Sequence, residues 1–317
     1  MNPFDLLAAC ILDATIGDPR TWPHPVRWMG KLAVSAERSI RRLCDGPQSL
    51  RIAGSVLAVG LPSLAFLLGW TLIAAGTTAH EWVGRGIGIC LASTALAWRD
   101  LIDHVGTVSD ALKADSLEDA RHAVGLIVGR DTNNLSEAEV VRATVETIAE
   151  SASDGVIAPL LYLAVGGPPL ALAYKAVSTL DSMIGHRDEQ YRDFGWASAR
   201  LDDVANWIPA RITAALITLG AGVVFLNTQS MRRSAVILLR DGHKHPSPNS
   251  GRPEAAMAGA LGVQLGGVNI YQGLRAERPV LGDALEPLSI KHVDRAARIV
   301  SVAYVMTIVV SMRLLWR

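Results

Sequence analysis

Residues 52–79 read IAGSVLAVGLPSLAFLLGWTLIAAGTTA, and none of these 28 side chains is charged. A helix rises about 1.5 Å per residue and needs roughly 20 residues to cross the hydrocarbon core of a bilayer, so this segment is long enough. The alternative is a buried core helix, but core helices of soluble proteins rarely run so far without a charge. The sequence therefore predicts a transmembrane helix here.

Other apolar segments extend this interpretation. Residues 82–98 have tryptophan at both ends and are predicted to form the returning arm of a hairpin, while residues 299–312 lie uncharged between Arg298 and Arg313 and are predicted to span. Residues 3–16 lack a basic region before them, so they are interpreted as a partial span and not as a cleavable signal peptide.

Two central segments allow more than one structural interpretation. Residues 156–173 are interrupted by Gly-Gly-Pro-Pro at 166–169, which favours a re-entrant hairpin or two short helices. Residues 204–226 contain Arg211, so this helix either tilts at the interface or lines a site. We predict an all-α, polytopic helical membrane protein with four to six membrane segments, re-entrant ones included.

Composition agrees with a membrane protein and excludes other classes. Half of the 317 residues are hydrophobic, the mean hydropathy is +0.27, and 30 Lys+Arg balance 30 Asp+Glu. Without an excess of basic charge, a nucleic-acid partner is not expected. The three cysteines are widely spaced and form no C-x-x-C pair, so neither a disulfide framework nor a zinc site is expected.

No internal repeat or domain boundary is visible, so a single integral membrane domain over residues 1–317 is predicted, with its site formed by polar loops. Residues 17–51 carry 7 Lys+Arg against 3 acids and are expected on the cytoplasmic side, while residues 99–155 carry 12 acids against 5 bases. The predicted polar loops are 17–51, 99–155, 174–203 and 227–296.

The first polar cluster lies on a predicted helix. Ser136-Glu137-Ala138-Glu139 is a capping box that starts a helix running to about residue 151. Arg142, Glu146 and Glu150 recur every four residues and Asp154 follows, so three carboxylates are expected in a line. A solvated face explains the stripe as well as a site does, but carboxylates at a membrane boundary can also hold Mg²⁺.

Three further polar clusters lie between the apolar segments. The prolines at 246 and 248 hold residues 243–249 extended, and His24 stands between two prolines with an arginine three residues away. For residues 243–249 the alternative to a functional role is a rigid surface loop. For residues 175–206 it is structural ion pairs, and for His24 it is a structural histidine. The clusters are residues 17–27; residues 175–206; and residues 243–249 with Glu254 and residues 266–271.

Several of these blocks resemble the adenosylcobinamide-phosphate synthase family of cobalamin biosynthesis. The resemblance covers most of the chain in order and departs from the family pattern at Ser151, Ala152, Ser178 and Arg252. Its blocks are LLAACILDATIGDPRTWPHPVRWMGKL (6–32), VGRDTNNL (128–135), AESASDGVIAPLLY (149–162), AYKAVSTLDSMIGHRDEQYRDFGWASARLDDVANWIPAR (173–211) and HKHPSPNSGRPEAAMAGALGVQLGGVNIY (243–271).

The resemblance implies a multi-pass enzyme of the cell membrane that joins the propionate carboxylate of adenosylcobyric acid to aminopropanol or its phosphate. ATP would be the co-substrate and Mg²⁺ the assisting ion, and other cobalamin-assembly enzymes are expected partners besides membrane lipid. A membrane corrinoid-binding or transport protein is the alternative, although transporters usually show paired repeats. A membrane phosphotransferase acting on a lipid-linked alcohol is a second enzyme alternative. It would be supported by acidic metal ligands gathered in a D-x-x-D-style constellation within one helix, which the separated polar clusters do not provide.

An amide ligase of this kind must bind phosphate, metal, carboxylate and amine together, and side-chain type suggests the candidates. The predicted catalytic residues are His24, Glu150, Asp154, Asp181 and His245, with either histidine as the base; the predicted metal ligands are Glu146, Glu150 and Asp154; the predicted phosphate- or corrinoid-binding residues are Arg27, Arg130, Lys175, Arg187, Arg192, Arg200, Asn249 and Asn269.

Overall fold

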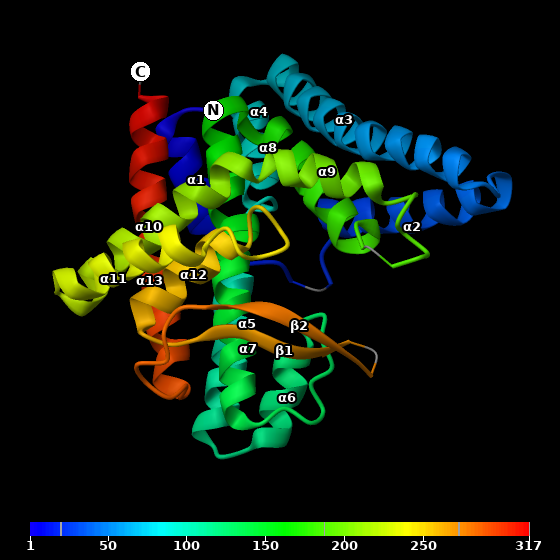
Figure 1. The fold of residues 1–317 in the computed structure, drawn as a ribbon. Coiled ribbons are helices and arrows are strands. Elements are labelled where there is room, and N and C mark those ends of the chain that lie inside the picture. Colours follow the sequence, from blue (N-terminus) through cyan, green and yellow to red (C-terminus); the bar gives the residue numbers. More distant parts are fainter. Residues whose placement is uncertain (20, 187, 272, 317) are drawn as a thin grey trace. The chain divides into compact units, whose positions relative to one another are not determined.

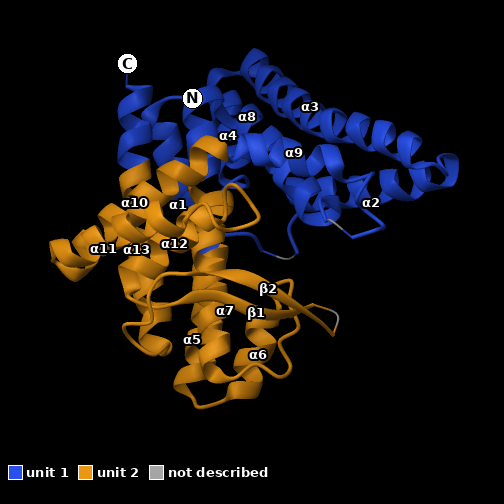
Figure 2. Cartoon of the chain, in the orientation of Figure 1, with its two compact units in different colours: residues 1–99, 158–206, 308–317 blue, residues 100–157, 207–307 orange. Residues whose placement is uncertain are grey.

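The computed structural model describes residues 1–19, 21–186, 188–271 and 273–316, and these are predominantly helical (Figure 1). They form two compact units, each assembled from separate stretches of the chain (Figure 2). Unit 1 comprises residues 1–99, 158–206 and 308–317, and unit 2 comprises residues 100–157 and 207–307. The single integral membrane domain over residues 1–317 stays a prediction.

Unit 1 is built around two long apolar helices, α3 and α8. Leu61 and Ala65 of α3 pack in one core with Leu172, Ala176 and Leu180 of α8. The helices of unit 1 are α1 (Pro3–Ile16), α2 (Pro25–Leu43), α3 (Pro47–Ala79), α4 (Glu81–Ser93), α8 (Ala158–Ile184) and α9 (Trp196–Ala205). The unit also contains the first residues of α5 (Trp98–Lys113) and the end of α13 (Ile290–Leu315).

Unit 2 combines helices with an antiparallel hairpin. Helix α12 is buried along almost its whole length, and its alanines and glycines allow α10 and α11 to pack closely against it. Besides most of α5, the elements of unit 2 are α6 (Leu117–Gly125), α7 (Glu137–Ser151), the π-helix η1 (Ala152–Ile157), α10 (Trp207–Phe225), α11 (Thr228–Asp241), α12 (Gly251–Leu261), β1 (Leu265–Tyr271), β2 (Leu274–Leu281) and much of α13 (Ile290–Leu315).

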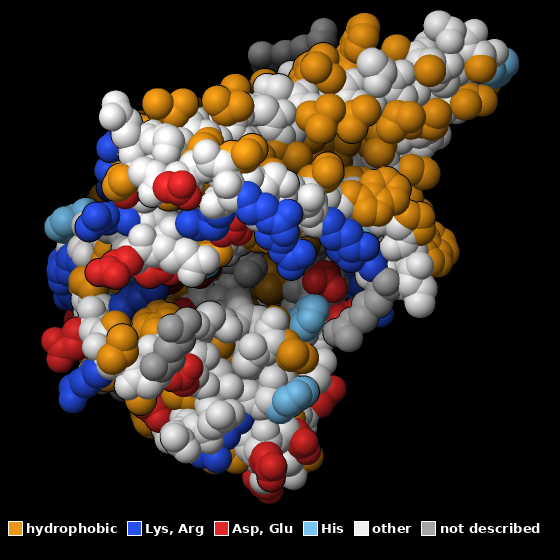
Figure 3. All heavy atoms as spheres, turned by 90° about the vertical axis from the view of Figure 1, so that its right-hand side faces the viewer, with side chains coloured by type: hydrophobic (Ala, Val, Ile, Leu, Met, Phe, Trp, Pro, Cys, Tyr) orange, Lys and Arg blue, Asp and Glu red, His pale blue; other side chains and the backbone are white. Residues whose placement is uncertain are grey.

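Four helical segments in the described part of the chain are long and apolar enough to cross a membrane, which agrees with the predicted polytopic class. Hydrophobic side chains gather over the upper part of the face in Figure 3, as expected for a surface in contact with lipid. The prediction of four to six membrane segments is therefore met at its lower bound. The four candidates are Pro47–Ala79, Glu137–Ile184, Trp207–Phe225 and Ile290–Leu315.

The two central apolar segments form helices of different continuity. Helix α8 is interrupted at Gly167, whose φ of 68° and ψ of −167° are non-helical, so the Gly-Gly-Pro-Pro sequence separates two helical arms as predicted. Helix α10 is continuous. Its Arg211 donates a hydrogen bond of 2.6 Å to the Trp207 carbonyl and stacks 4.0 Å from the centre of the Trp207 ring, so its charge is accommodated locally.

Some predicted boundaries and loops need correction. The predicted returning arm, residues 82–98, ends as α4 at Ser93, and α1 and α4 both fall short of the length that marks a candidate span. Three of the four predicted polar loops, residues 17–51, 99–155 and 174–203, are mostly helical in the described part of the chain, and the fourth, residues 227–296, includes α11, α12 and the start of α13. Residues 227–296 also hold the β1–β2 hairpin, which an all-α prediction omits.

Candidate active site

Helix α7 starts as its sequence predicts. The Ser136 hydroxyl accepts from the Glu139 amide at 3.4 Å, and the Glu139 carboxylate accepts from the Ser136 amide at 2.8 Å. This reciprocal capping satisfies two donors at the helix start. The helix ends at Ser151, where the π-helix η1 takes over. A π-turn contains one more residue than an α-turn, so the predicted line of carboxylates does not continue to Asp154.

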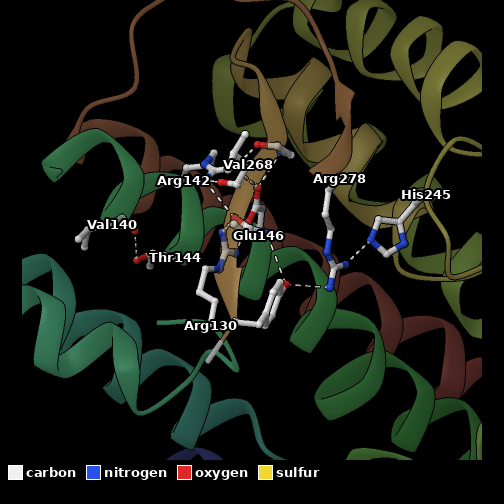
Figure 4. Close-up of polar contacts among 11 residues, drawn as sticks. Arg130, Val140, Arg142, Thr144, Glu146, His245, Val268 and Arg278 are labelled. Atoms are coloured by element: carbon white, nitrogen blue, oxygen red, sulfur yellow. Dashed lines mark hydrogen bonds and ion pairs between the residues drawn. The ribbon is translucent and has the colours of Figure 1, made fainter. Parts of the chain in front are cut away.

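Glu146 is the centre of a buried network of polar side chains in unit 2 (Figure 4). Its carboxylate forms an ion pair with Arg130, accepts from the Gly266 amide at 2.8 Å, and has Arg142 at 3.9 Å. The Arg130, Arg142 and Glu146 side chains are each at most 10% exposed. Buried charges are tolerated only when paired and hydrogen-bonded, and this carboxylate meets both conditions.

Arg142 ties α7 to the hairpin. Its guanidinium donates to the carbonyls of Gly266 and Val268, the latter at 2.8 Å, and to Asn269 Oδ1 at 3.1 Å. Arg130 donates to the same Asn269 oxygen at 2.6 Å. Two predicted substrate-binding residues, Arg130 and Asn269, are therefore held by one another in this structure.

The glycines of the hairpin make this contact possible. Gly266 and Gly267 have φ angles of +79° and +88°, and the strand register shifts between Leu265 and Gly267. A Cβ atom at Gly266 would lie 2.1 Å from the Pro279 carbonyl oxygen, which excludes any side chain. The resulting β-bulge lets the Gly266 amide reach Glu146 while its carbonyl reaches Arg142.

A second chain of contacts connects His245 to the hairpin. The Arg278 guanidinium of β2 lies 2.6 Å from His245 Nε2 and donates to the Tyr271 hydroxyl at 3.0 Å; Figure 4 shows the contact between Arg278 and His245. The Ser247 amide donates to His245 Nδ1 at 3.0 Å. Because both ring nitrogens face donors, a protonated imidazole has no acceptor here. Burial, together with the positive charge of Arg278, lowers the pKa of His245 to about 4.

This shift predicts acid sensitivity. An unfolded histidine titrates near 6.5, so between about pH 6.5 and pH 4 the unfolded chain binds a proton that the folded chain does not. Stability is expected to be full above this window and to fall by ~3 kcal/mol as the pH drops through it. Unfolding curves in detergent from pH 7.5 to pH 4 measure the slope. The slope should diminish in His245→Gln, and an equal slope in that variant would contradict the assignment.

Two further carboxylates of the candidate site belong to Glu150 and Glu254. The Ser250 hydroxyl donates to Glu150 Oε1 at 3.2 Å, and the Ser250 amide is 3.2 Å from the Ser247 hydroxyl. Glu254 is buried on α12, and this burial, followed by the negative charges of Glu150 and Glu146, raises the pKa of Glu254 well above its usual range. Glu150 itself is exposed, so it is available to a ligand.

The structure thus brings six of the predicted site residues into or beside one constellation and adds others. Asn249 is buried beside Ser247, whose hydroxyl accepts from its amide at 3.3 Å. Arg278 carries no sequence signal, because it lies beyond the 266–271 block on an unpredicted strand. Glu254 and Tyr271 stand out in the sequence without an assigned role. The predicted residues here are Arg130, Glu146, Glu150, His245, Asn249 and Asn269.

The remaining predicted residues lie elsewhere. His24 Nε2 lies 2.9 Å from Asp18, and Arg27 donates to the Pro19 carbonyl at 2.8 Å, so both stabilise the start of α2. Arg200 is exposed and pairs with Asp203 at 3.5 Å. Lys175 and Asp181 lie on α8, and Arg192 is exposed between α8 and α9. Arg187 lies outside the described residues.

The predicted magnesium ligands do not come together as a set of three. Glu146 is engaged by Arg130 and Gly266, and Asp154 lies in η1. Among the residues that the structure describes, no three histidine, cysteine or acidic side chains are grouped to hold a metal ion. The metal role of these residues stays a prediction, in which Glu150 is the exposed carboxylate.

Fold and site together define a helical membrane protein whose unit 2 holds a buried cluster of arginines, carboxylates and one neutral histidine. Over residues 6–300 the chain matches the family described as "CobD/Cbib protein", and it belongs to that family. The resemblance noted from the sequence blocks is thereby confirmed, and the membership supports a biosynthetic role in the formation of cobalamin.

Relatives with curated names agree. The chain is 45% identical over 301 residues to the cobalamin biosynthesis protein CobD of Klebsiella pneumoniae, covering 94% of this chain and 93% of that one. It is 50% identical over 283 residues to CobD of Geobacter metallireducens, covering 89% and 87%, and 44% identical to CbiB of Salmonella typhi, covering 94% and 93%. No solved structure matches the chain.

Proposed function

We propose that this protein is the adenosylcobinamide-phosphate synthase of cobalamin biosynthesis, an ATP-dependent ligase that forms an amide. The observation that carries the proposal is the family match over residues 6–300, with relatives named cobalamin biosynthesis proteins. The polar cluster of unit 2 supports it, because such a ligase needs cations for phosphate and carboxylates for an amine. We expect the protein to act at the cell membrane.

The reaction proceeds in two steps. The corrinoid carboxylate attacks the γ-phosphorus of ATP, the bond between the β-γ bridging oxygen and that phosphorus breaks, and ADP leaves behind an acyl phosphate. The amine, after losing a proton to a base, attacks the acyl carbon. The carbon–oxygen bond then breaks, phosphate leaves, and the amide remains.

The contacts among the described residues suggest a role for each side chain of the candidate site. Arg130, Arg142 and Glu146 hold one another rigidly, so they form a frame that positions the hairpin. Arg278 is half-buried and is oriented by His245 and Tyr271, which suits it to hold a phosphoryl group. Glu150 is exposed at the end of α7 and is the candidate for the ammonium of the amino alcohol.

Mg²⁺ is proposed to enter with ATP. Mg²⁺ in phosphoryl-transfer sites usually uses one or two protein carboxylates plus substrate phosphates, so it does not require the three-carboxylate set that the structure lacks among its described residues. Glu150 is the carboxylate we expect to take part. When bound, the ion would neutralise charge on the phosphate oxygens.

The deciding experiment incubates the purified protein in nanodiscs with adenosylcobyric acid, ATP, Mg²⁺ and aminopropanol phosphate. We expect a corrinoid product heavier by one amide condensation, with one ADP and one phosphate released per amide. AMP and pyrophosphate would instead indicate an acyl adenylate and would contradict the acyl phosphate. Corrinoid binding without product, for any amino alcohol, would favour the alternative of a membrane corrinoid-binding or transport protein.

A further inference from the structure

An open groove runs along the first turns of α3 in unit 1, with a volume of about 850 Å³. One end of the groove is polar, since Gln48 and Arg51 lie there, and the rest is formed mainly by small and aliphatic residues. A change from basic to apolar along one helix face matches an amphiphile with a negative head. The lining residues are Gln48, Arg51, Ile52, Ser55, Val56, Val59 and Gly60.

The apolar part of the groove has no cover. Ile52, Val56 and Val59 are 61%, 68% and 63% exposed, and a Cβ atom added at Gly60 would meet nothing within 4 Å. These residues begin a helix that is long and apolar enough to cross a membrane. Exposed aliphatic side chains in such a helix are stable when hydrocarbon covers them, so an acyl chain is the natural occupant.

The polar end has the features of a membrane interface. The Arg51 guanidinium lies 4.0 Å from the centre of the Trp196 ring, and Trp196 is 42% exposed. Tryptophan and arginine together are typical of the headgroup level of a bilayer. Within the described part of the chain, no acidic side chain pairs with Arg51, so its charge is available to an anion.

Helix α2, which leads directly into α3, adds positive charge. It contains five basic residues and one acid. Lys31, Arg38 and Arg42 are exposed, share one helical face by their spacing, and have no ion pair among the described residues. Trp28 and Leu32 are exposed beside that face. A basic face bordered by exposed tryptophan and leucine is typical of a helix lying in an anionic membrane surface.

We propose that the α3 groove binds one anionic glycerophospholipid, with its phosphate against Arg51 and an acyl chain along Ile52, Val56 and Val59. The basic face of α2 surrounds the headgroup with positive potential and selects a negative lipid over a zwitterionic one. The site belongs to unit 1 and involves none of the groups that we assign to the amide ligase. The proposal therefore stands independently of the proposed function.

The test is native mass spectrometry of the full-length protein in detergent, titrated separately with phosphatidylglycerol and phosphatidylcholine. The wild type is expected to bind one phosphatidylglycerol about tenfold more tightly than phosphatidylcholine, a ratio that corresponds to ~1.4 kcal/mol. Arg51→Gln should reduce this preference, because it removes the cation at the phosphate while the basic face of α2 remains. Val56→Trp, which fills the groove, should weaken both lipids. Arg275→Gln removes an exposed charge on β2 and serves as the control that should bind as the wild type does.

Four outcomes would overturn the proposal. The first is equal binding of the two lipids by the wild type. The second is a Val56→Trp variant that binds both lipids unchanged. The third is displacement of phosphatidylglycerol by glycerophosphoglycerol, which has no acyl chains, at equal concentration, since that would indicate a site for free phosphate esters. A dimer that forms only when lipid is absent would point to a second copy of the chain as the occupant instead.

Discussion

Replacing Glu146 with alanine is expected to lower the free energy of unfolding by about 3–5 kcal/mol, because it leaves a buried guanidinium without its partner. Arg130 is only 8% exposed and would retain the Asn269 oxygen alone, while the Gly266 amide would lose its acceptor. The hairpin would consequently loosen from α7. Thermal or SDS-induced unfolding of the detergent-solubilised protein measures the loss.

The matched control for this prediction is Arg200→Ala. Arg200 is 65% exposed and its pair with Asp203 spans 3.5 Å, so its loss should cost less than about 1 kcal/mol. If Glu146→Ala were no more destabilising than Arg200→Ala, the buried network would not be the element that holds the hairpin. Glu146→Gln should fall between them, because an amide oxygen can still accept from Gly266.

The second large effect is expected on catalysis. Glu150→Gln should lower the rate of amide formation by about 10²- to 10⁴-fold, since a neutral amide can attract neither an ammonium nor a magnesium ion as a carboxylate does. The stability of the protein should change little, because Glu150 is exposed and glutamine can still accept the hydrogen bond from Ser250. The steady-state rate with aminopropanol phosphate measures the effect.

Glu137→Gln is the matched control, because Glu137 is an exposed acid in the first turn of the same helix. It should keep the wild-type rate. A Glu150→Gln variant with unimpaired turnover would remove Glu150 from the site, while loss of activity in both variants would indicate a general effect of charge on α7. Product formation by the wild type in the same preparation is required first, because the variants can be compared only with an active enzyme.

The membrane helices were accessible from sequence because their signal is local. The backbone amides and carbonyls of an uncharged run such as residues 52–79 must be hydrogen-bonded within the run when it lies in lipid. The run therefore forms a helix, whatever lies around it. The same holds for the start of α7, where Ser136 and Glu139 cap the helix within four residues, and for the break at Gly167, where the glycine and prolines set the backbone. Each of these features depends only on neighbours in the chain.

The candidate site was only partly accessible for the opposite reason. The helical stripe of Arg142, Glu146 and Glu150 could be read from its spacing, but the partner of Glu146 is an arginine sixteen residues earlier, and its second donor is an amide 120 residues later. Arg278 belongs to a strand that no alternation of polar and apolar residues indicated. The π-helix at residues 152–157 also shifts Asp154 out of the expected line.

The sequence by itself determined the class of this protein, its long apolar helices and its family, because these follow from charge-free runs, caps and ordered blocks of residues. Only the tertiary structure decided which charges neutralise one another. Glu146 became the partner of Arg130 and the hairpin bulge, His245 came to lie beside Arg278 with its pKa lowered, and Glu150 was left exposed. The physical reason is that a buried charge takes whatever partner the fold brings within hydrogen-bond distance, and sequence separation does not limit that choice.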